Sequence, residues 1–177
     1  MKEIESHFPK AFLARQGETF TELEERLNKV GEGFVTTLLE VEDADFYTPV
    51  TEDKWSPAEL ADHLVKANEL FGRALENVIK SEDIIVMERG KVTDDGRPLS
   101  PAAEEPDPDR PRLELVQAFE ETLHQLITAG SQVEDADRLD EVCVDQSFFG
   151  PMTGLENLQL CAWHIRHHTK QLPTYQI

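Results

Sequence analysis

The sequence contains only two cysteines among its 177 residues, Cys143 and Cys161, and they do not form a C-x-x-C motif. So low a count excludes a disulfide framework. Long apolar runs are also missing, since no stretch approaches the ~20 residues that a membrane-spanning helix requires. The N-terminal segment, M-K-E-I-E, is polar and unlike a signal peptide. We therefore expect a soluble, cytoplasmic protein.

Basic residues are scarce as well. Lys and Arg number 17 against 36 Asp and Glu, which gives a formal net charge of -19 and a pI of about 4.6. A chain this acidic is repelled by phosphate backbones and by anionic membrane surfaces, so we expect neither nucleic acid nor membrane as a partner. Aromatic residues make up only 7% of the chain, but the apolar residues are too regularly spaced for disorder. The length suits one domain over 1–177, with its core at about 18–172.

Four segments place apolar residues three or four positions apart, which is the period of an amphipathic helix. The second segment has the clearest start, because Ser56-Pro57-Ala58-Glu59 fits a capping box with proline in the first turn. A second capping-box pattern starts at Thr153 and opens the fourth segment, which Pro173 ends. The predicted helices cover about 20–41, 57–80, 111–130 and 153–172.

The longest connection, 81–110, contains four prolines among many acidic residues. A loop of this length is unusual in a compact domain, and it can carry the chain from one end of a bundle to the other. A second irregular piece, 134–152, includes an expected extended segment at 142–144 and an expected turn at 149–151. We predict an all-α fold, namely a four-helix bundle with a long crossover between its second and third helices.

Three of the six histidines fall within five residues on the fourth predicted helix. His164 and His168 are four positions apart and share a face. At about 100° per residue, His168 lies about 50° and His164 about 90° from the centre of the apolar stripe, whereas His167 lies about 150° away and is expected to face water. On the second helix, His63 lies about 60° from the apolar stripe. The three inward-leaning imidazoles are therefore His63, His164 and His168.

Three neutral imidazoles from two facing helices form a suitable ligand set for one divalent ion of zinc, nickel or iron. Three protein ligands leave a coordination position for water or substrate, and a coordinated water or thiol loses its proton near neutral pH. The alternative interpretation is that these histidines are satisfied core or boundary residues that bind no metal.

Other chemistries have weaker signals. A di-iron carboxylate bundle needs two Glu-x-x-His motifs, and the sequence has one, from Glu121 to His124, whose ends point away from the apolar stripe. Neither a G-x-S-x-G motif nor a glycine-rich phosphate loop occurs. Cys161 lies on the apolar stripe, one turn before His164, and either is a small buried residue or lines the pocket. Cys143 has no basic neighbour in sequence that would lower its pKa.

Several stretches resemble the DinB-like (DinB/YfiT) family. W-S-P-A-E-L-A-D-H-L at 55–64 is similar to the family's W-[ST]-x-x-[EQ]-x-x-x-H-[LV] opening of the second helix. F-G-P-M-T at 149–153 and H-x-x-x-H-x-x-Q at 164–171 resemble its G-P-x-[ST] turn and its last helix. The resemblance covers about 18–172. It implies a four-helix bundle that holds a divalent metal with His63, His164 and His168. Gln171 would support one of these ligands without binding the metal itself.

The resemblance also implies a range of activities. Relatives include thiol S-transferases that use bacillithiol, mycothiol or glutathione, a thiol-dependent maleylpyruvate isomerase and metal-dependent hydrolases, and homodimers are frequent. We expect a homodimeric metal-dependent thiol S-transferase acting on a small molecule. The alternatives are a non-catalytic, stress-associated binding or scaffold protein and a metal-dependent hydrolase.

The charge of the segments around the site affects which substrates can approach it. If the acidic segments 81–110 and 134–145 border the metal, they attract cations and discourage anionic substrates. A local basic patch would override this effect, and its candidate members are Lys66, Arg73 and Arg166.

Overall fold

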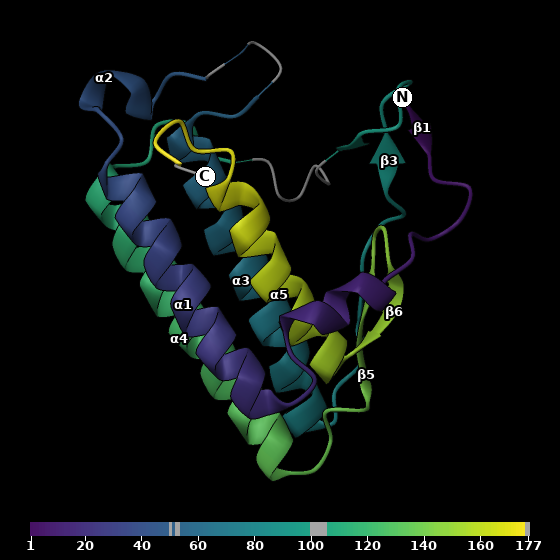
Figure 1. Ribbon diagram of the computed structural model, residues 1–177. Coiled ribbons are helices and arrows are strands. Elements are labelled where there is room, and N and C mark those ends of the chain that lie inside the picture. Colours follow the sequence, from purple (N-terminus) through teal and green to yellow (C-terminus); the bar gives the residue numbers. More distant parts are fainter. Residues whose placement is uncertain (50, 52–53, 100–105, 176–177) are drawn as a thin grey trace.

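The computed structural model describes residues 1–49, 51, 54–99 and 106–175. Its four long helices form a bundle, which confirms the predicted all-α four-helix architecture (Figure 1). A 3-10 helix, η1 (Ala11–Gln16), precedes the bundle, and a short helix, α2 (Asp43–Phe46), follows its first helix. Within the described ranges, no helix is long and apolar enough to cross a membrane. The four long helices are α1 (Phe20–Leu39), α3 (Pro57–Lys80), α4 (Arg112–Asp135) and α5 (Gly154–Thr169).

Three of these helices begin at a capping box. In each, the N-cap hydroxyl accepts a hydrogen bond from the third helical residue, whose Glu side chain accepts one from the N-cap backbone. The boxes of α3 and α5 lie where they were predicted, whereas the box of α1 was not predicted. The pairs are Thr19 with Glu22, Ser56 with Glu59, and Thr153 with Glu156.

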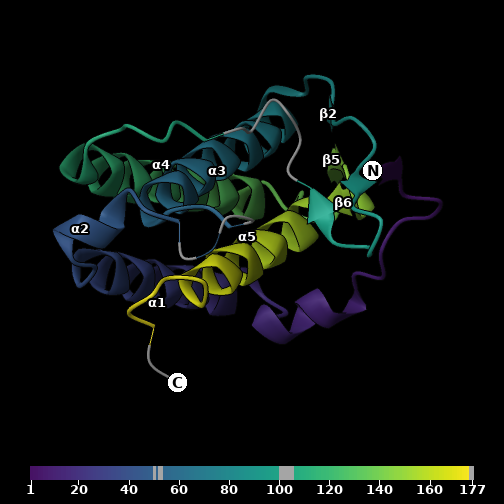
Figure 2. The same cartoon turned by 90° about the horizontal axis from the view of Figure 1, so that it is seen from above.

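The helices run as two parallel pairs. α1 and α5 point toward one end of the bundle, while α3 and α4 point toward the other (Figures 1 and 2). In agreement, Phe20 at the start of α1 lies beside Gly130 near the end of α4. Asn157 near the start of α5 donates a hydrogen bond to the backbone oxygen of Phe71, in the second half of α3, at 3.1 Å. The start of α3 and the end of α5 therefore meet at the same end of the bundle.

The predicted end of α4 near residue 130 is wrong, because the helix continues to Asp135. Gly130 packs tightly against two neighbouring helices, α1 and α5. A Cβ atom at this position would lie 3.0 Å from the Phe20 ring on α1 and 3.1 Å from the Leu158 side chain on α5. The glycine thus permits close helix packing and does not act as a C-cap.

Two other helices end earlier than their apolar pattern predicts. α1 ends at Leu39 and α5 at Thr169, yet Val41 and Leu172 beyond them are still buried in the core. Apolar periodicity reports which side chains are buried, and burial continues for a few residues after the helical backbone has ended.

Two small three-stranded sheets accompany the bundle. In the first, β5 (Val142–Gln146) pairs antiparallel with β6 (Gly150–Thr153) and parallel with β2 (Ile85–Val86). In the second, β3 (Lys91–Val92) pairs antiparallel with both β1 (Lys2–Glu3) and β4 (Pro98–Leu99). The predicted extended segment at 142–144 is confirmed as part of β5. The turn lies at 147–149, two residues before the predicted one.

The predicted crossover links the far end of α3 to the start of α4, as expected for two parallel helices. Residues 85–99 of the crossover contribute β2, β3 and β4 to the two sheets, which periodicity in the sequence did not predict. Residues 100–105 of the crossover, Pro101 among them, lie outside the described residues. Residues 106–110 return the chain to the end of the bundle where α3 begins.

Candidate metal centre

The three histidines selected from the sequence come together between α3 and α5. His63 lies in the second turn of α3, and His164 and His168 lie in the last turns of α5. The Nε2 atom of His164 is 3.0 Å from Nε2 of His63 and 3.0 Å from Nε2 of His168. All three candidate ligand atoms lie within 4.8 Å of one another. His63 and His168 are buried, and His164 is half-buried.

This arrangement suits a cation better than a hydrogen-bonded histidine cluster. The Nε2 atom of a neutral imidazole offers either one proton or one lone pair, so His164 cannot form a good hydrogen bond with both neighbours. Imidazole nitrogens lie about 2.0–2.1 Å from a bound zinc ion, and two nitrogens 3.0 Å apart can both lie at that distance from one ion. The residues present therefore fit a divalent metal.

The surroundings keep the rings of His164 and His168 neutral. Burial lowers the pKa of His164 and His168 well below the ordinary histidine value, and the neighbouring histidines lower both pKa values further. A neutral ring retains the lone pair with which histidine binds a metal. The same shifts leave these histidines without positive charge at neutral pH.

Gln171 fixes the tautomer of one candidate ligand. Its Oε1 atom accepts a hydrogen bond from Nδ1 of His168 at 3.1 Å, and its Nε2 atom donates one to Nε2 of His167 at 3.0 Å. Because an amide oxygen can only accept, Nδ1 of His168 carries the proton and Nε2 keeps its lone pair. A supporting residue is expected to bond the ring nitrogen that does not bind the metal, and Gln171 bonds that nitrogen of His168. His167 itself is exposed, in agreement with the helical wheel.

Both tryptophans of the chain lie beside histidines: Trp55 beside two of the candidate ligands and Trp163 beside His167. The Trp55 ring centroid is 4.7 Å from that of His63 and 6.2 Å from that of His168. Trp163 stacks on His167 with centroids 4.9 Å apart. Trp55 immediately precedes the N-cap of α3, so the capping box places it over the cluster. The sequence motif contained Trp55, but nothing in the pattern predicted the ring contact with His168.

The two cysteines and the Glu121–His124 motif show no sign of a catalytic or metal-binding role. Cys161 is buried in the core, and burial raises its pKa, helped by the nearby Cys143. Burial also raises the pKa of the Cys143 thiol, to about 12. Both thiols are therefore protonated at neutral pH, and neither is an activated nucleophile. Glu121 and His124 are exposed on α4, in agreement with the rejection of a di-iron site.

The acidic 134–145 segment and the three candidate basic residues lie in different parts of the bundle. The acidic 134–145 segment begins at the end of α4 that points away from the histidines, so it does not border them. Of the proposed basic patch, Lys66 pairs with Asp62 at 2.9 Å, and Arg73 lines a hollow of about 260 Å³ between α3 and α4. Arg166 is exposed on α5. The three basic residues thus have separate surroundings.

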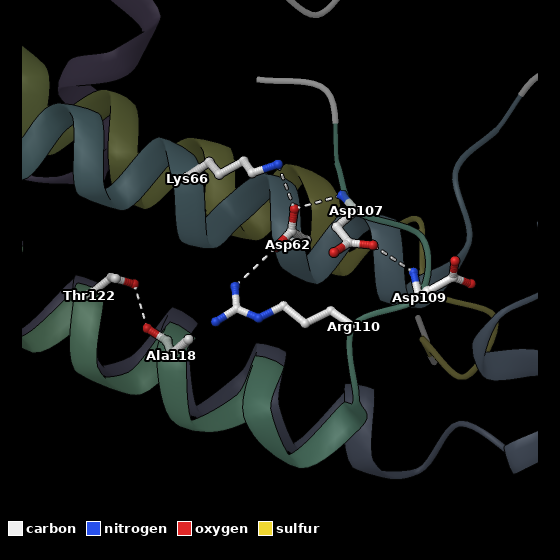
Figure 3. A network of polar contacts seen from close by, with 7 residues as sticks. All are labelled: Asp62, Lys66, Asp107, Asp109, Arg110, Ala118 and Thr122. Carbon is white, nitrogen blue, oxygen red and sulfur yellow. Dashed lines mark hydrogen bonds and ion pairs between the residues drawn. The ribbon is translucent and has the colours of Figure 1, made fainter. Parts of the chain in front are cut away.

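Asp62, next to His63 in sequence, is a polar residue that the sequence analysis missed. Its carboxylate is 1% exposed and contacts Lys66 Nζ at 2.9 Å and Arg110 Nη1 at 3.1 Å. It also accepts a hydrogen bond from the backbone N–H of Asp107 at 2.8 Å (Figure 3). Burial raises the pKa of Asp62, but the Asp107 N–H and the two cations outweigh burial and leave the pKa below its ordinary value. The i,i+4 spacing of Asp62 and Lys66 was the only local signal.

Comparisons with known proteins agree with this fold. The family model of the DinB superfamily matches residues 19–172. The crystal structure of TT2238, described as a four-helix bundle protein, superimposes with a TM-score of 0.62 at 20% identity, covering 89% of this chain and 100% of that one. At this identity the likeness concerns the fold alone. No curated protein matches the chain.

Proposed function

The chain belongs to the DinB superfamily, and from this membership and the histidine geometry we propose that it binds one divalent metal ion through His63, His164 and His168. The observation that carries the proposal is the convergence of three Nε2 atoms, two pairs of them 3.0 Å apart. The depressed pKa values of His164 and His168 and the tautomer set by Gln171 support it.

We propose further that the site is catalytic and of the thiol S-transferase type. When bound, a divalent ion supplies Lewis acidity that lowers the pKa of a coordinated thiol or water. The protein contributes three imidazole nitrogens, with His164 half-buried, and the Trp55 ring beside His63 and His168. Since both cysteines are buried and protonated, we expect the nucleophilic sulfur to come from a low-molecular-weight thiol such as bacillithiol, mycothiol or glutathione.

Metal binding is tested first on protein purified without a histidine tag. Elemental analysis should find one zinc, nickel or iron ion per chain, and a chelator should remove it. The tryptophans give a second readout, because paramagnetic Ni²⁺ or Cu²⁺ bound to the cluster quenches their fluorescence. The Trp55→Phe variant should lose most of that quenching. Protein that binds no divalent ion by either method overturns the proposal.

Activity is tested with each thiol and an electrophilic acceptor such as monochlorobimane. Turnover that stops on chelation and in the His63→Ala/His164→Ala variant supports an S-transferase. Ester cleavage without added thiol would instead identify a hydrolase. Metal binding without turnover on any thiol or ester would favour the non-catalytic binding or scaffold role.

The expected homodimer remains a prediction. Sedimentation equilibrium of the metal-loaded protein should give about twice the chain mass of 20.1 kDa. A monomer at micromolar concentration would contradict this expectation without affecting the metal site, whose three proposed ligands come from one chain.

A further inference from the structure

The crossover is fastened to α3 one residue away from a proposed metal ligand. Asp62 accepts a hydrogen bond from the Asp107 backbone and pairs with Arg110, which lie 45 and 48 positions further along the chain. Asp107 in turn accepts a hydrogen bond from the Asp109 backbone at 2.9 Å. Figure 3 shows these residues as one network between α3 and the segment that leads into α4. The network therefore joins two elements that are distant in sequence.

Asp62 and His63 hold different faces of the same helical turn. Adjacent helical residues project about 100° apart around the axis. His63 contacts His164 on α5, whereas Asp62 contacts the crossover and Arg110. Attachments on two faces oppose rotation of α3 about its own axis, in addition to the packing of α3 against α4. The nitrogen of a helix-borne ring lies roughly 6 Å from the axis, so a rotation of about 10° would move it by about 1 Å.

A metal site does not tolerate such a movement, because ligand distances must fall within about 0.2 Å of their preferred values. The first turn of α3 also carries the Ser56–Glu59 capping box, which fixes the helix start but not its rotation. A buried carboxylate needs partners to offset its desolvation. Asp62 obtains two of its three partners from the crossover end, and this supplies a physical reason for burying a charge at this position.

We propose that Asp62 is a positioning residue, which holds the end of the crossover against α3 and thereby fixes where His63 presents its ring. The inference rests on the proposed metal site for its effect on affinity. The positioning itself concerns only the chain and can be observed without metal. Asp62 does not contact the histidine nitrogens, and it acts through the backbone of α3.

The experiment compares five variants of the full chain by NMR in the absence of metal and by competition with a chromophoric chelator for zinc. Asp62→Asn should shift the ring resonances of His63 and speed amide exchange at Asp107. It should also weaken zinc binding by about tenfold, the lower end of the loss when an outer-shell partner is removed. Arg110→Gln should change both readouts in the same direction. Arg110→Lys keeps a cation beside Asp62 and should retain much of the wild-type zinc affinity and Asp107 exchange rate.

Two matched controls separate positioning from charge alone. Lys66→Gln removes a cation from the same carboxylate, but the Lys66–Asp62 pair lies within α3, so its loss should disturb the Asp107 amide less than the loss of Arg110. Glu76→Gln removes an acid that pairs with Lys80 on the same helix at 3.2 Å, and should change neither readout. Equal effects of Lys66→Gln and Arg110→Gln would contradict the proposal.

The outcomes remain distinguishable from those of the metal proposal. If the wild-type chain binds no metal, the His63 ring shift and the Asp107 exchange rate still decide the role of Asp62. If Asp62→Asn does not fold, Arg110→Gln retains the contacts of Asp62 with Lys66 and Asp107 and carries the test. Wild-type His63 resonances and zinc affinity in both variants overturn the inference.

Discussion

The two ends of the bundle bury different kinds of side chain. At the end where α5 begins, Leu158 and Val133 are fully buried around the close contact at Gly130, and the buried polar residue Asn157 contributes a neutral amide. At the other end, the histidine end, the buried set includes the ionisable side chains of Asp62, His63 and His168. Apolar burial stabilises a fold by about 25 cal/mol per Å², whereas a buried ionisable group costs free energy unless it is paired. The comparison indicates that the end where α5 begins mainly supplies stability, while the histidine end uses part of that stability to hold ionisable groups in place.

The largest expected effect is a loss of zinc affinity when a candidate ligand at the histidine end is removed. His164→Ala removes the nitrogen that lies 3.0 Å from both other ligand atoms. Zinc affinity should fall by more than about 100-fold, beyond the usual cost of losing an outer-shell partner. Because His164 is half-buried, thermal unfolding of the metal-free variant should change less than in Leu158→Ala. Calorimetric titration measures the first quantity and differential scanning calorimetry the second. Wild-type affinity in this variant would contradict the ligand assignment.

The opposite change acts at the end where α5 begins. Leu158 is fully buried, and its truncation to alanine should lower the free energy of unfolding by about 3 kcal/mol, within the usual range for buried leucine. Zinc affinity should stay at the wild-type value, because Leu158 lies more than one helical turn from His164. Urea unfolding checks the stability, with Leu113→Ala as the control, since Leu113 is 70% exposed. A loss of metal affinity equal to that of His164→Ala would remove the distinction between the ends.

A smaller effect tests the tautomer at the histidine end. Gln171→Ala removes the acceptor for His168 Nδ1 and should weaken zinc binding by about tenfold. Gln171→Glu keeps an acceptor oxygen at that position and should restore most of the affinity. Gln125→Ala is the matched control, because it removes an exposed glutamine amide on α4. Equal affinities of the alanine and wild-type proteins would show that ring orientation does not depend on Gln171.

The sequence predicted those features that local chemistry determines. Ser56 and Glu59 mark the start of α3 because a capping box needs only four consecutive residues. His164 and His168 share a helix face because of their spacing alone. His63 needed only the apolar stripe of its own helix to be assigned to the interior. The three candidate ligands were therefore accessible to pattern reasoning before their mutual distances were known.

Features that depend on distant residues were not predicted. Gly130 looked like a helix end, but Phe20 and Leu158 from other helices determine its role. The link between Asp62 and Arg110 spans 48 positions, and the pairing of β1 with β3 joins the N-terminus to the crossover. The placement of the acidic 134–145 segment depended on the direction of α4, which follows from the crossover and not from composition.

The smallest expected effect concerns the boundary between the two ends, where Cys161 lies on α5 between Leu158 and His164. Burial raises the pKa of Cys143 to about 12 and raises that of Cys161 as well, so the folded chain favours the protonated thiols. The unfolded chain releases these protons near the ordinary pKa of 9.0. Stability should therefore be fully retained below that value and decline as the pH rises above it.

The reactivity of the two thiols follows from the same shifts. Because burial raises the pKa of both thiols, very few of them are ionised in the folded chain at pH 8, so a disulfide reagent should modify neither cysteine faster than the protein unfolds. Mass spectrometry of the modified peptides resolves the two sites, and urea-unfolded protein gives the full reaction rate. Fast modification of Cys161 alone would mean that solvent reaches the α5 core from the histidine end. Cys161 would then line the site, as the second interpretation of the sequence proposed, and the boundary between the two ends would lie nearer to Leu158.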